Sequence, residues 1–365
     1  MLSHGGIGRD EDGWSNQAEL TQRLTVAGTR HTILYGVEVG TQIKDAVSLQ
    51  ARVVAVTSLY APVLPTVDNA AFTAASASTL NRFETLGVYA QDVVDIGGGL
   101  KALAGVRYDD FRQRTRQRLP GQPDLARVDR KWSPRAGLVF QPDAAQSYYA
   151  SWSRSFQPSG ETFALAAGNA DIAPEQTVNR EVGAKYTLFG GRVQVQAAGF
   201  VLTRTGIKGT DPVSNLVLPI GTQRTRGAEL SVQLDLGGVH ATAGFAYLDT
   251  RITASATPDF LGKRATITPL NAANLLLTKA LGRVGVGGGA NYVGDRWADP
   301  ANTTVLPGYV TIDALAWIDV GRVRLQVNAY NLGDRRYIVS GHGTSPLLNA
   351  PGAPRSVLGT VRVGF

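Results

Sequence analysis

The sequence contains only a few residue groups whose types and spacing could carry chemistry. Asp109 and Asp110 are adjacent carboxylates, the side chains that general acid–base catalysis often uses. Residues 285–290 read GVGGGA, which fits the G-x-G-x-x-A pattern of a dinucleotide-binding turn. Imidazole, a common metal ligand, occurs four times, at His4, His31, His240 and His342. Each of these groups needs a particular structural element to position it.

The expected elements do not support these chemistries. Adjacent residues of a β-strand point to opposite faces, so Asp109 and Asp110 would not meet one reactant. A dinucleotide-binding turn must lead into a helix, whereas residues 291–293 continue a strand pattern. The histidines lack the close spacing of a metal site, and the sequence contains no G-x-S-x-G element. We therefore expect no enzyme activity and no metal held by the protein.

Composition narrows the class of protein. The chain has 365 residues, 42 glycines, no cysteine and a net charge of +7. Without cysteine, a disulfide scaffold and a Cys-zinc site are excluded. No apolar run approaches the ~18 residues that a membrane helix needs. The basic residues are scattered rather than clustered in a block, so we do not expect a nucleic-acid partner. A membrane β-barrel stays possible, because its alternating strands average to a neutral hydropathy.

Apolar and polar residues alternate with a period of two along most of the chain. In residues 227–236 every even position is apolar, and the odd positions are Gly, Glu, Ser, Gln and Asp. This pattern predicts strands with one apolar face. Fifteen strands are predicted, at about 16–26, 30–40, 83–96, 99–112, 132–142, 146–156, 178–189, 192–205, 222–236, 239–251, 270–282, 284–296, 309–321, 322–339 and 355–365.

The connections between these strands alternate between short and long. Short Gly-rich turns, such as residues 97–99 and 190–191, alternate with loops at 41–82, 113–131, 157–177, 206–221, 252–269, 297–308 and 340–354. The strands exceed the usual ~5–6 residues and match the ~9–11 of a tilted membrane strand. The fold class predicted is therefore all-β: a partial antiparallel transmembrane β-barrel of about 15 strands, with short periplasmic turns and long extracellular loops.

Two of the predicted strands allow the orientation of individual side chains to be predicted. Asp92, in GVYAQDVVDI, falls on the face predicted to meet lipid, and the sequence offers no reason for a charge there. The last strand, SVLGTVRVGF, is expected to direct Val361 and Val363 toward lipid and Arg362 toward the lumen. Phe365 would lie at the periplasmic interface, where aromatic rings are favoured. In outer-membrane barrels such a strand resembles the signal read by the insertion machinery, here Val361, Val363 and Phe365.

Several motifs, in order, resemble those of TonB-dependent outer-membrane receptors, most closely the ferric-siderophore (ferrichrome-type) branch. LGVYAQDVVDIGGGLKALAGVRYDDF resembles a hairpin of that family, and WSPRAGLVFQPDAAQSYYASWSRSFQP resembles the next one. IAPEQTVNREVGAKY and GTQRTRGAELSVQ resemble the starts of two later strands. LPGYVTIDALA, VNAYNLGDRRY and PRSVLGTVRVGF are similar to the C-terminal run of the family. The resemblance covers residues 83–365.

The resemblance also sets an expectation about domains. Members of the family carry a signal peptide, a short TonB-docking segment (the TonB box), a plug domain and then a barrel of 22 strands. The sequence that begins MLSHGGIGRDEDGW shows none of the first three. Residues 1–365 are therefore expected to be the C-terminal part of a receptor barrel. A passive porin-like channel, an outer-membrane barrel enzyme such as a lipase or protease, and a non-functional remnant are the alternatives.

The resemblance implies a ferric siderophore as substrate in the bacterial outer membrane. Iron would be chelated by the siderophore, so no cofactor is expected in the protein. A hydroxamate is favoured, although the cobalamin and carbohydrate branches share most of these motifs. Other partners would be outer-membrane lipid and lipopolysaccharide, the barrel insertion machinery and, in a full-length form only, TonB. In the family, aromatic and arginine side chains of the upper wall and long loops hold the substrate. The candidates here, which could instead be interfacial or lipopolysaccharide contacts, are Tyr60, Phe72, Trp132, Trp152, Phe156, Phe163, Trp297, Arg114, Arg116 and Arg118.

Overall fold

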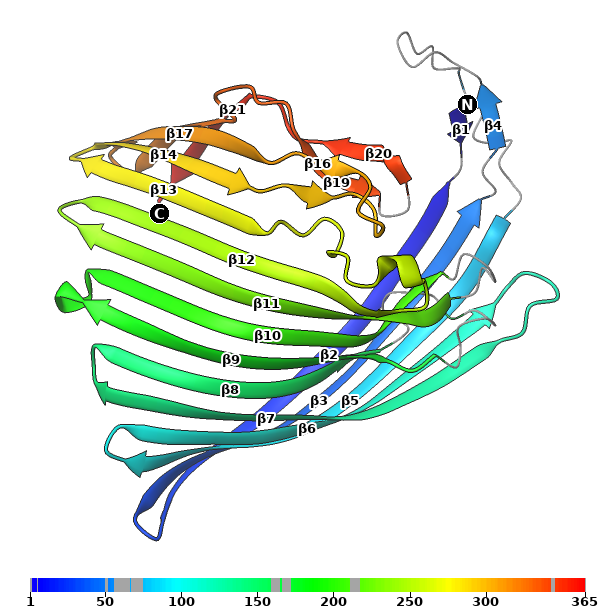
Figure 1. Cartoon of the computed structure of the whole chain (residues 1–365), viewed down its shortest axis with the longest axis horizontal. Coiled ribbons are helices and arrows are strands. Elements are labelled where there is room, and N and C mark those ends of the chain that lie inside the picture. Colours follow the sequence, from blue (N-terminus) through cyan, green and yellow to red (C-terminus); the bar gives the residue numbers. More distant parts are fainter. Residues whose placement is uncertain are drawn as a thin grey trace.

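A single antiparallel sheet of 15 strands dominates the computed structural model (Figure 1). The structure describes residues 2–4, 6–49, 52–55, 66, 75–158, 165, 172–210, 217–342 and 345–364. The strands of this sheet follow one another in chain order, each paired with the next, and β2 and β21 are its two edges. In order they are β2 (Ile7–Val26), β3 (Thr29–Leu49), β5 (Ala75–Gly97), β6 (Leu100–Gln117), β7 (Leu125–Asp143), β8 (Gln146–Gln157), β9 (Glu175–Leu188), β10 (Val193–Thr210), β11 (Val217–Leu236), β12 (Val239–Ser255), β13 (Asn271–Leu281), β14 (Val284–Val293), β17 (Tyr309–Val320), β18 (Val323–Tyr330) and β21 (Ser356–Val363).

Smaller elements lie in the connections. Two-stranded pairs are formed by β1 (Leu2–His4) with β4 (Arg52–Ala55), β15 (Arg296–Trp297) with β16 (Val305–Leu306), and β19 (Ile338–His342) with β20 (Ser345–Pro351). Short 3-10 turns occur at η2 (Phe189–Gly191) and η3 (Pro258–Phe260). Within the described ranges, no helix is long and apolar enough to span a membrane.

The short turns gather at one rim of the curved sheet and the long connections at the other (Figure 1). Between β11 and β12, Gly237 and Gly238 have φ values of 60° and 76°. Two consecutive residues with positive φ form the turn type whose twist matches that of an antiparallel hairpin, and glycine adopts it without strain. The alternation of short and long connections predicted from the sequence is confirmed, as is the number of strands in the sheet.

The strand ends at the long-loop rim differ from the prediction. β3 continues to Leu49 instead of residue 40, and β5 begins at Ala75 instead of residue 83. The predicted loop 113–131 shrinks to residues 118–124, because β6 and β7 both extend into it. Both faces of these extensions carry polar side chains mixed with a few apolar ones, such as Ile43 and Leu80, so they lack the alternation that marks a strand with one apolar face. They pair regularly all the same, because backbone hydrogen bonds do not depend on side-chain polarity.

The strand predicted at 322–339 also ends early, at Tyr330. Asn331 and Asp334 follow with φ values of 49° and 47°, a left-handed conformation that Asn and Asp tolerate better than most residues. The Asn331 side chain stabilises this turn by accepting a hydrogen bond from the amide of Arg335 at 2.9 Å. The chain therefore leaves the sheet here, and β19 is a separate strand.

The two faces of the sheet differ in polarity, and the apolar face is exposed. Val361 and Val363 lie on the outer face, 67% and 49% exposed. Arg362 lies on the inner face, opposite Arg324 in the register of β18 and β21. The predicted orientation of the last strand is confirmed; Phe365 lies outside the described residues. The hydrophobic residues buried within the described part are few: Phe111, Leu165, Ile252, Ala265, Ala298 and Leu306. An apolar exterior with almost no core suits a wall between lipid and a polar lumen.

The long connections near the C-terminal end of the sheet pack on one another. The guanidinium of Arg296 donates to the carbonyls of Ile338 and Val339 at 2.7 and 2.6 Å. The amide of Ile267 donates to the carbonyl of Trp297 at 2.9 Å. Ala298, between these contacts, is fully buried. We call residues 264–267, 296–306 and 338–341 the loop cluster.

Candidate ligand-binding wall of the lumen

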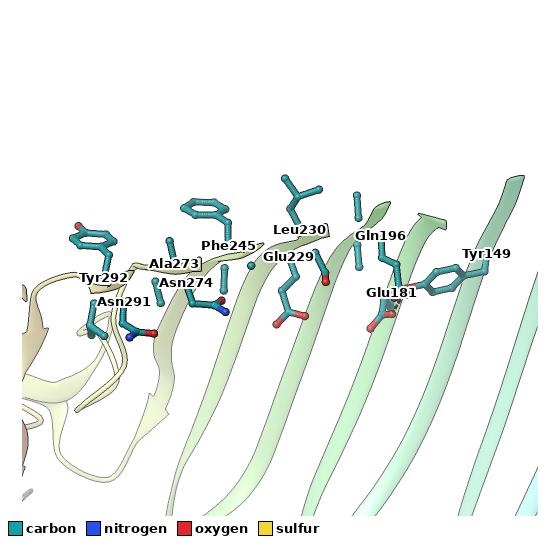
Figure 2. Close-up of a pocket in the computed structure, with 17 residues that line it drawn as sticks. Tyr149, Glu181, Gln196, Glu229, Leu230, Phe245, Ala273, Asn274, Asn291 and Tyr292 are labelled. Atoms are coloured by element: carbon teal, nitrogen blue, oxygen red, sulfur yellow. Dashed lines mark hydrogen bonds between the residues drawn. The ribbon is translucent and has the colours of Figure 1, made fainter. Parts of the chain in front are cut away.

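The inner face of β8 to β14 carries a cavity of about 620 Å³, lined by both polar and apolar residues (Figure 2). Glu181, Glu229 and Asn274 point to one side of the sheet, and Leu230 and Phe245 point to the other (Figure 2). The Tyr149 hydroxyl donates to Oε1 of Glu181 at 2.6 Å. The strands produce this separation because alternate residues face opposite sides.

The two glutamates of this cavity have unused hydrogen-bonding capacity. In the described part of the chain, neither Glu181 nor Glu229 has a cationic ion-pair partner. Asn291 lines the same cavity, and its amide donates to Oδ2 of Asp313 at 3.2 Å. A carboxylate in ionised form accepts hydrogen bonds only. The cavity can therefore receive cationic or amide donors from whatever enters the lumen.

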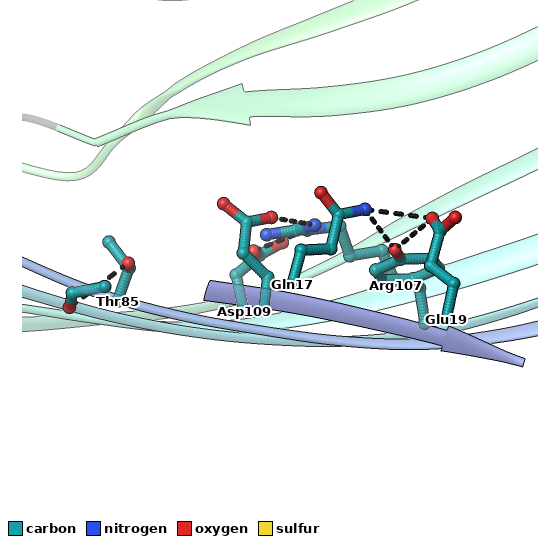
Figure 3. Close-up of polar contacts among 8 residues, drawn as sticks. Gln17, Glu19, Thr85, Arg107 and Asp109 are labelled. Atoms are coloured by element: carbon teal, nitrogen blue, oxygen red, sulfur yellow. Dashed lines mark hydrogen bonds and ion pairs between the residues drawn. The ribbon is translucent and has the colours of Figure 1, made fainter. Parts of the chain in front are cut away.

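A second network covers the inner face of β2 to β6 (Figure 3). Arg107 donates from Nε to Asp109 at 2.7 Å and from Nη1 to Glu38 at 2.8 Å. The Tyr89 hydroxyl donates to Oε1 of Glu19 at 2.6 Å, and the Gln17 amide donates to the same hydroxyl at 2.6 Å. These bonds connect four strands across the lumen wall.

Glycines on neighbouring strands make room for the large side chains of this network. A Cβ on Gly36 would lie 2.0 Å from the ring of Tyr89, and one on Gly87 would lie 2.2 Å from Nη2 of Arg107. Neither position could therefore carry a side chain without displacing its neighbour. The two glycines therefore leave the space that the Tyr89 ring and the Arg107 guanidinium occupy.

A third polar cluster lies on the inner face near the long-loop rim. Glu175, only 4% exposed, forms an ion pair with Arg204 and accepts a hydrogen bond from the amide of Lys208 at 3.2 Å. Arg127 and Asp129 form an ion pair at 2.7 Å. Gln113 is 1% exposed, and neither atom of its amide has a hydrogen-bond partner among the described residues. Buried amides are rarely left unpaired, so a polar group that reached Gln113 would find both atoms of its amide available.

A match to a protein-family model identifies the family to which this sheet belongs. The β-barrel model of the TonB-dependent receptor-like family matches residues 3–332. The chain belongs to the TonB-dependent receptor family. This family consists of receptors and transporters, and its barrels are proteins of the bacterial outer membrane.

The relatives that the chain matches include receptors for siderophores. It is 28% identical over 369 residues to the ferrichrome outer membrane transporter/phage receptor of Escherichia coli, covering 96% of this chain and 48% of the relative. It is 31% identical over 244 residues to the ferrioxamine B receptor of Salmonella typhimurium, covering 64% of this chain and 34% of that protein. The chain thus spans about half or less of the length of these relatives.

Solved structures show the same fold. The siderophore receptor PiuA from Acinetobacter baumannii superposes with a TM-score of 0.87 at 24% identity, covering 97% of this chain and 56% of that chain. The closed form of the ferric-catecholate import receptor Fiu from Escherichia coli gives a TM-score of 0.84 at 22% identity, with coverages of 98% and 55%. The resemblance of the motifs to this family, seen in the sequence, is confirmed.

The structure separates the two adjacent carboxylates of the chain. Asp109 faces the lumen, where Arg107 binds it. Asp110 lies on the outer face and accepts from Arg112 at 2.7 Å and Arg130 at 2.8 Å. The predicted opposite orientation of the pair is confirmed, and residues 285–290 lie within strand β14 as predicted. In the described ranges no three His, Asp or Glu side chains group as a metal site would require.

Most of the predicted ligand-binding residues that the structure describes lie outside the lumen. Trp132 is on the outer face, 62% exposed, with its ring 4.9 Å from that of Tyr108. Trp152 is also on the outer face, and the half-buried Phe156 shares its side of β8. These positions correspond to the interfacial alternative, and a role in ligand binding stays a prediction.

The other candidates are similarly dispersed. Arg114 and Arg116 are exposed on the outer face of β6. Arg118 forms two hydrogen bonds with Asp45 at 2.7 and 2.6 Å. Trp297 belongs to the loop cluster. Tyr60, Phe72 and Phe163 lie outside the described residues.

The candidate ligand-binding residues predicted from the sequence do not include those that form the lumen wall. Tyr89, Arg107 and Glu181 alternate with residues of the apolar outer face, so strand parity contained the information. Residue type and nearness to loops, which select the predicted candidates, do not distinguish the two faces of a strand. Parity along each strand would have separated the two sides of the wall.

Proposed function

We propose that this chain forms the barrel wall of an outer-membrane receptor for TonB-dependent uptake of ferric siderophores. The observation that carries the proposal is the inner wall, where carboxylates and amides face the lumen behind an apolar exterior. The relatives named for ferrichrome and ferrioxamine B support iron-chelate transport. A ferric hydroxamate is the substrate class that the sequence resemblance favours.

The proposed transport involves no bond chemistry in the protein. Iron would arrive and leave as the siderophore complex, so the protein needs no cofactor. Gln113, Arg204 and Lys208, near the long-loop rim, are the proposed contacts of the chelate. Glu181 and Glu229, deeper in the lumen, would bind donor groups of a lumen-filling plug domain in the full-length protein. TonB would act on that domain to open the path.

Growth of an iron-starved, receptor-deleted bacterium tests this function. Supplying the full-length gene is expected to restore growth on a ferric hydroxamate, and removal of TonB is expected to abolish the rescue. A matched strain carrying the empty vector controls for other uptake routes. If no ferric siderophore restores growth while the receptor is present in the outer membrane, the iron assignment is wrong.

A passive porin-like channel is the second candidate, because a polar lumen wall also suits a water-filled pore. Such a channel would conduct ions in a planar bilayer without TonB, whereas the proposed receptor would stay closed in its full-length form. A non-functional remnant would show neither conductance nor siderophore-dependent growth.

A further inference from the structure

Three polar side chains meet on the outer face of the wall, near its short-turn rim. The hydroxyl oxygen of Thr29 lies 3.0 Å from Nε2 of His31. Nδ1 of the same imidazole lies 2.6 Å from Oδ2 of Asp92. A hydroxyl, an imidazole and a carboxylate joined through these two ring nitrogens form the arrangement by which hydrolases activate a nucleophile.

Strand pairing brings these side chains together from distant positions in the chain. Thr29 and His31 are alternate residues of β3, so they face the same side of the sheet. Asp92 lies on β5, two positions from Val94, which is the partner of His31 in register. Such diagonal neighbours are within reach of long side chains. The arrangement therefore depends on the sheet, and the spacing of residues in the sequence does not reveal it.

The hydrogen bonds give the imidazole the role of a base. An ionised carboxylate only accepts hydrogen bonds, so Nδ1 of His31 donates to Asp92. In the neutral ring Nε2 then has the lone pair, and it faces the Thr29 oxygen. The Thr29 hydroxyl donates to the carbonyl of Val26 at 2.7 Å, and rotation about its C–O bond would direct the same hydrogen to Nε2. His31 can thus take the proton of a nucleophile while Asp92 holds the ring in the required tautomer.

The turn before Thr29 supplies hydrogen-bond donors of a second kind. Ala27 and Gly28 form this turn, with φ values of 48° and 83°. Within the described ranges, neither of their amides donates to a backbone carbonyl. Backbone amides of this kind stabilise the oxyanion that forms when a carbonyl group is attacked. A nucleophile, a base and candidate oxyanion donors therefore occur within one hairpin and its neighbouring strand.

The surroundings of these residues indicate what could react there. The side chains of His31 and Asp92 are 21% and 30% exposed, so a reactant can approach both. Val26, opposite Thr29 in register, is 52% exposed on the same face. Ile96, on β5, is 49% exposed. This apolar surface suits the acyl chain of an ester, whose carbonyl group would then lie at the Thr29 hydroxyl.

We propose that Thr29, His31 and Asp92 form an esterase site that hydrolyses acyl esters reaching the outer face of the wall. Thr29 is the nucleophile and His31 is the general base, so these two are the catalytic residues. Asp92 acts through His31 and is a positioning residue. The site lies on the opposite face of the wall from the lumen cavity, and its activity does not depend on the proposed transport function.

The reaction balances without a cofactor. The Thr29 oxygen attacks the carbonyl carbon of the ester while its proton moves to Nε2 of His31. The carbon–oxygen bond to the alcohol then breaks, and the alcohol leaves with that proton. Water attacks the remaining acyl–Thr29 ester and gives one proton to Nε2, and the carboxylic acid departs as Thr29 recovers its hydrogen. The sum is an ester and water giving an acid and an alcohol.

Hydrolysis of para-nitrophenyl octanoate by the full chain in detergent micelles tests the proposal, measured as nitrophenolate released above the rate in empty micelles. Thr29→Val keeps the shape of the side chain and removes the nucleophile. Asp92→Asn keeps the size of the side chain and removes the acceptor that fixes the tautomer. We expect each variant to lower kcat by at least about a hundredfold, as loss of acid–base catalysis does. Thr25→Val, at an exposed threonine on the lumen side of the same hairpin, is the matched control and should keep the wild-type rate.

A covalent label separates catalysis from a purely structural role. A fluorophosphonate reacts with an activated hydroxyl: the Thr29 oxygen bonds to phosphorus, fluoride leaves, and His31 takes the proton. Peptide mass spectrometry should locate the label on Thr29 in the wild type. Asp92→Asn retains the hydroxyl and should be labelled at least about tenfold more slowly, because the base is no longer held in the required tautomer.

Three results would overturn the proposal. Nitrophenolate release no faster than in empty micelles would show that the unaltered chain is not an esterase. An equal rate in the wild type and Thr29→Val would place the activity at other residues. A label on a residue other than Thr29 would do the same. The first comparison uses the unaltered chain, so it decides the matter even if a variant does not fold.

Discussion

Nδ1 of His31 lies 2.6 Å from Oδ2 of Asp92 on the outer face of the sheet, near the short-turn rim. The two residues sit on the paired strands β3 and β5. The sequence offers no reason for a carboxylate at Asp92 on the lipid-facing side, and the structure supplies one, because the imidazole of His31 is its partner. Asp92 still has one oxygen, Oδ1, buried without a hydrogen-bond partner in the described part of the chain. The contact with His31 therefore satisfies only one of the two carboxylate oxygens that Asp92 places on the apolar outer face.

Removal of His31 is expected to destabilise the sheet. His31→Ala should lower the free energy of unfolding by about 1 kcal/mol, because an unpaired charge near the membrane interface is mildly unfavourable. The double variant His31→Leu, Asp92→Leu should be at least as stable as the wild type, since apolar residues often replace a partly buried ion pair without loss. Urea unfolding in lipid vesicles, followed by tryptophan fluorescence, measures both. An equal loss in the two variants would show that the carboxylate left unpaired is not the cause of the destabilisation.

The contact between Tyr89 and Gly36 gives a second prediction. Gly36→Ala would place a Cβ 2.0 Å from the tyrosine ring, which must then leave its hydrogen bonds to Glu19 and Gln17. Overpacking of this kind costs about 1–3 kcal/mol, and the loss should appear in urea unfolding. Gly8→Ala is the matched control, because no atom lies within 4 Å of its added Cβ. If both variants unfold alike, the close packing of the ring is not stabilising.

Strand parity explains what the sequence could predict. The fifteen strands and the orientation of Arg362 followed from alternation and from short turns such as Gly237–Gly238, which are local properties. The extensions of β3 and β5 could not be predicted, because polar and apolar residues are mixed on both of their faces and no regular alternation marks them. The pairing of Asp92 with His31 depends on which strands become neighbours and in which register, and a single sequence does not contain that information.

Asp299 in the loop cluster links local stability to pH. Burial opposes its ionisation, but hydrogen bonds from the amides of Thr303 and Thr304 outweigh burial and hold its pKa below the ordinary 3.8. Because the pKa is lower in the folded state, the ionised carboxylate stabilises the loop above the unfolded pKa. This stabilisation is lost as pH falls through the lowered pKa.

Hydrogen exchange at the Thr303 and Thr304 amides measures this effect. Protection is expected to be constant from neutral pH down to about pH 4 and to fall at lower pH, after correction for intrinsic exchange. Asp299→Asn should reduce protection already at neutral pH and remove the acid-dependent step. A step of unchanged size in Asp299→Asn would assign it to another carboxylate.

The position of Trp132 separates an interfacial role from a role in ligand binding. Its ring packs on Tyr108 at 4.9 Å on the outer face, away from the lumen wall. Trp132→Ala should therefore lower the free energy of unfolding by about 0.5–1.5 kcal/mol, the usual contribution of an aromatic pair beyond its buried area. Siderophore affinity of the full-length receptor should not change.

Gln113→Ala, on the inner face, is the contrasting variant and is expected to weaken siderophore binding if that cluster holds the chelate. Equilibrium binding of a radiolabelled ferric hydroxamate to outer-membrane vesicles measures both variants. A loss of affinity in Trp132→Ala alone would return the ligand to the aromatic residues of the outer wall, and the lumen assignment would be wrong.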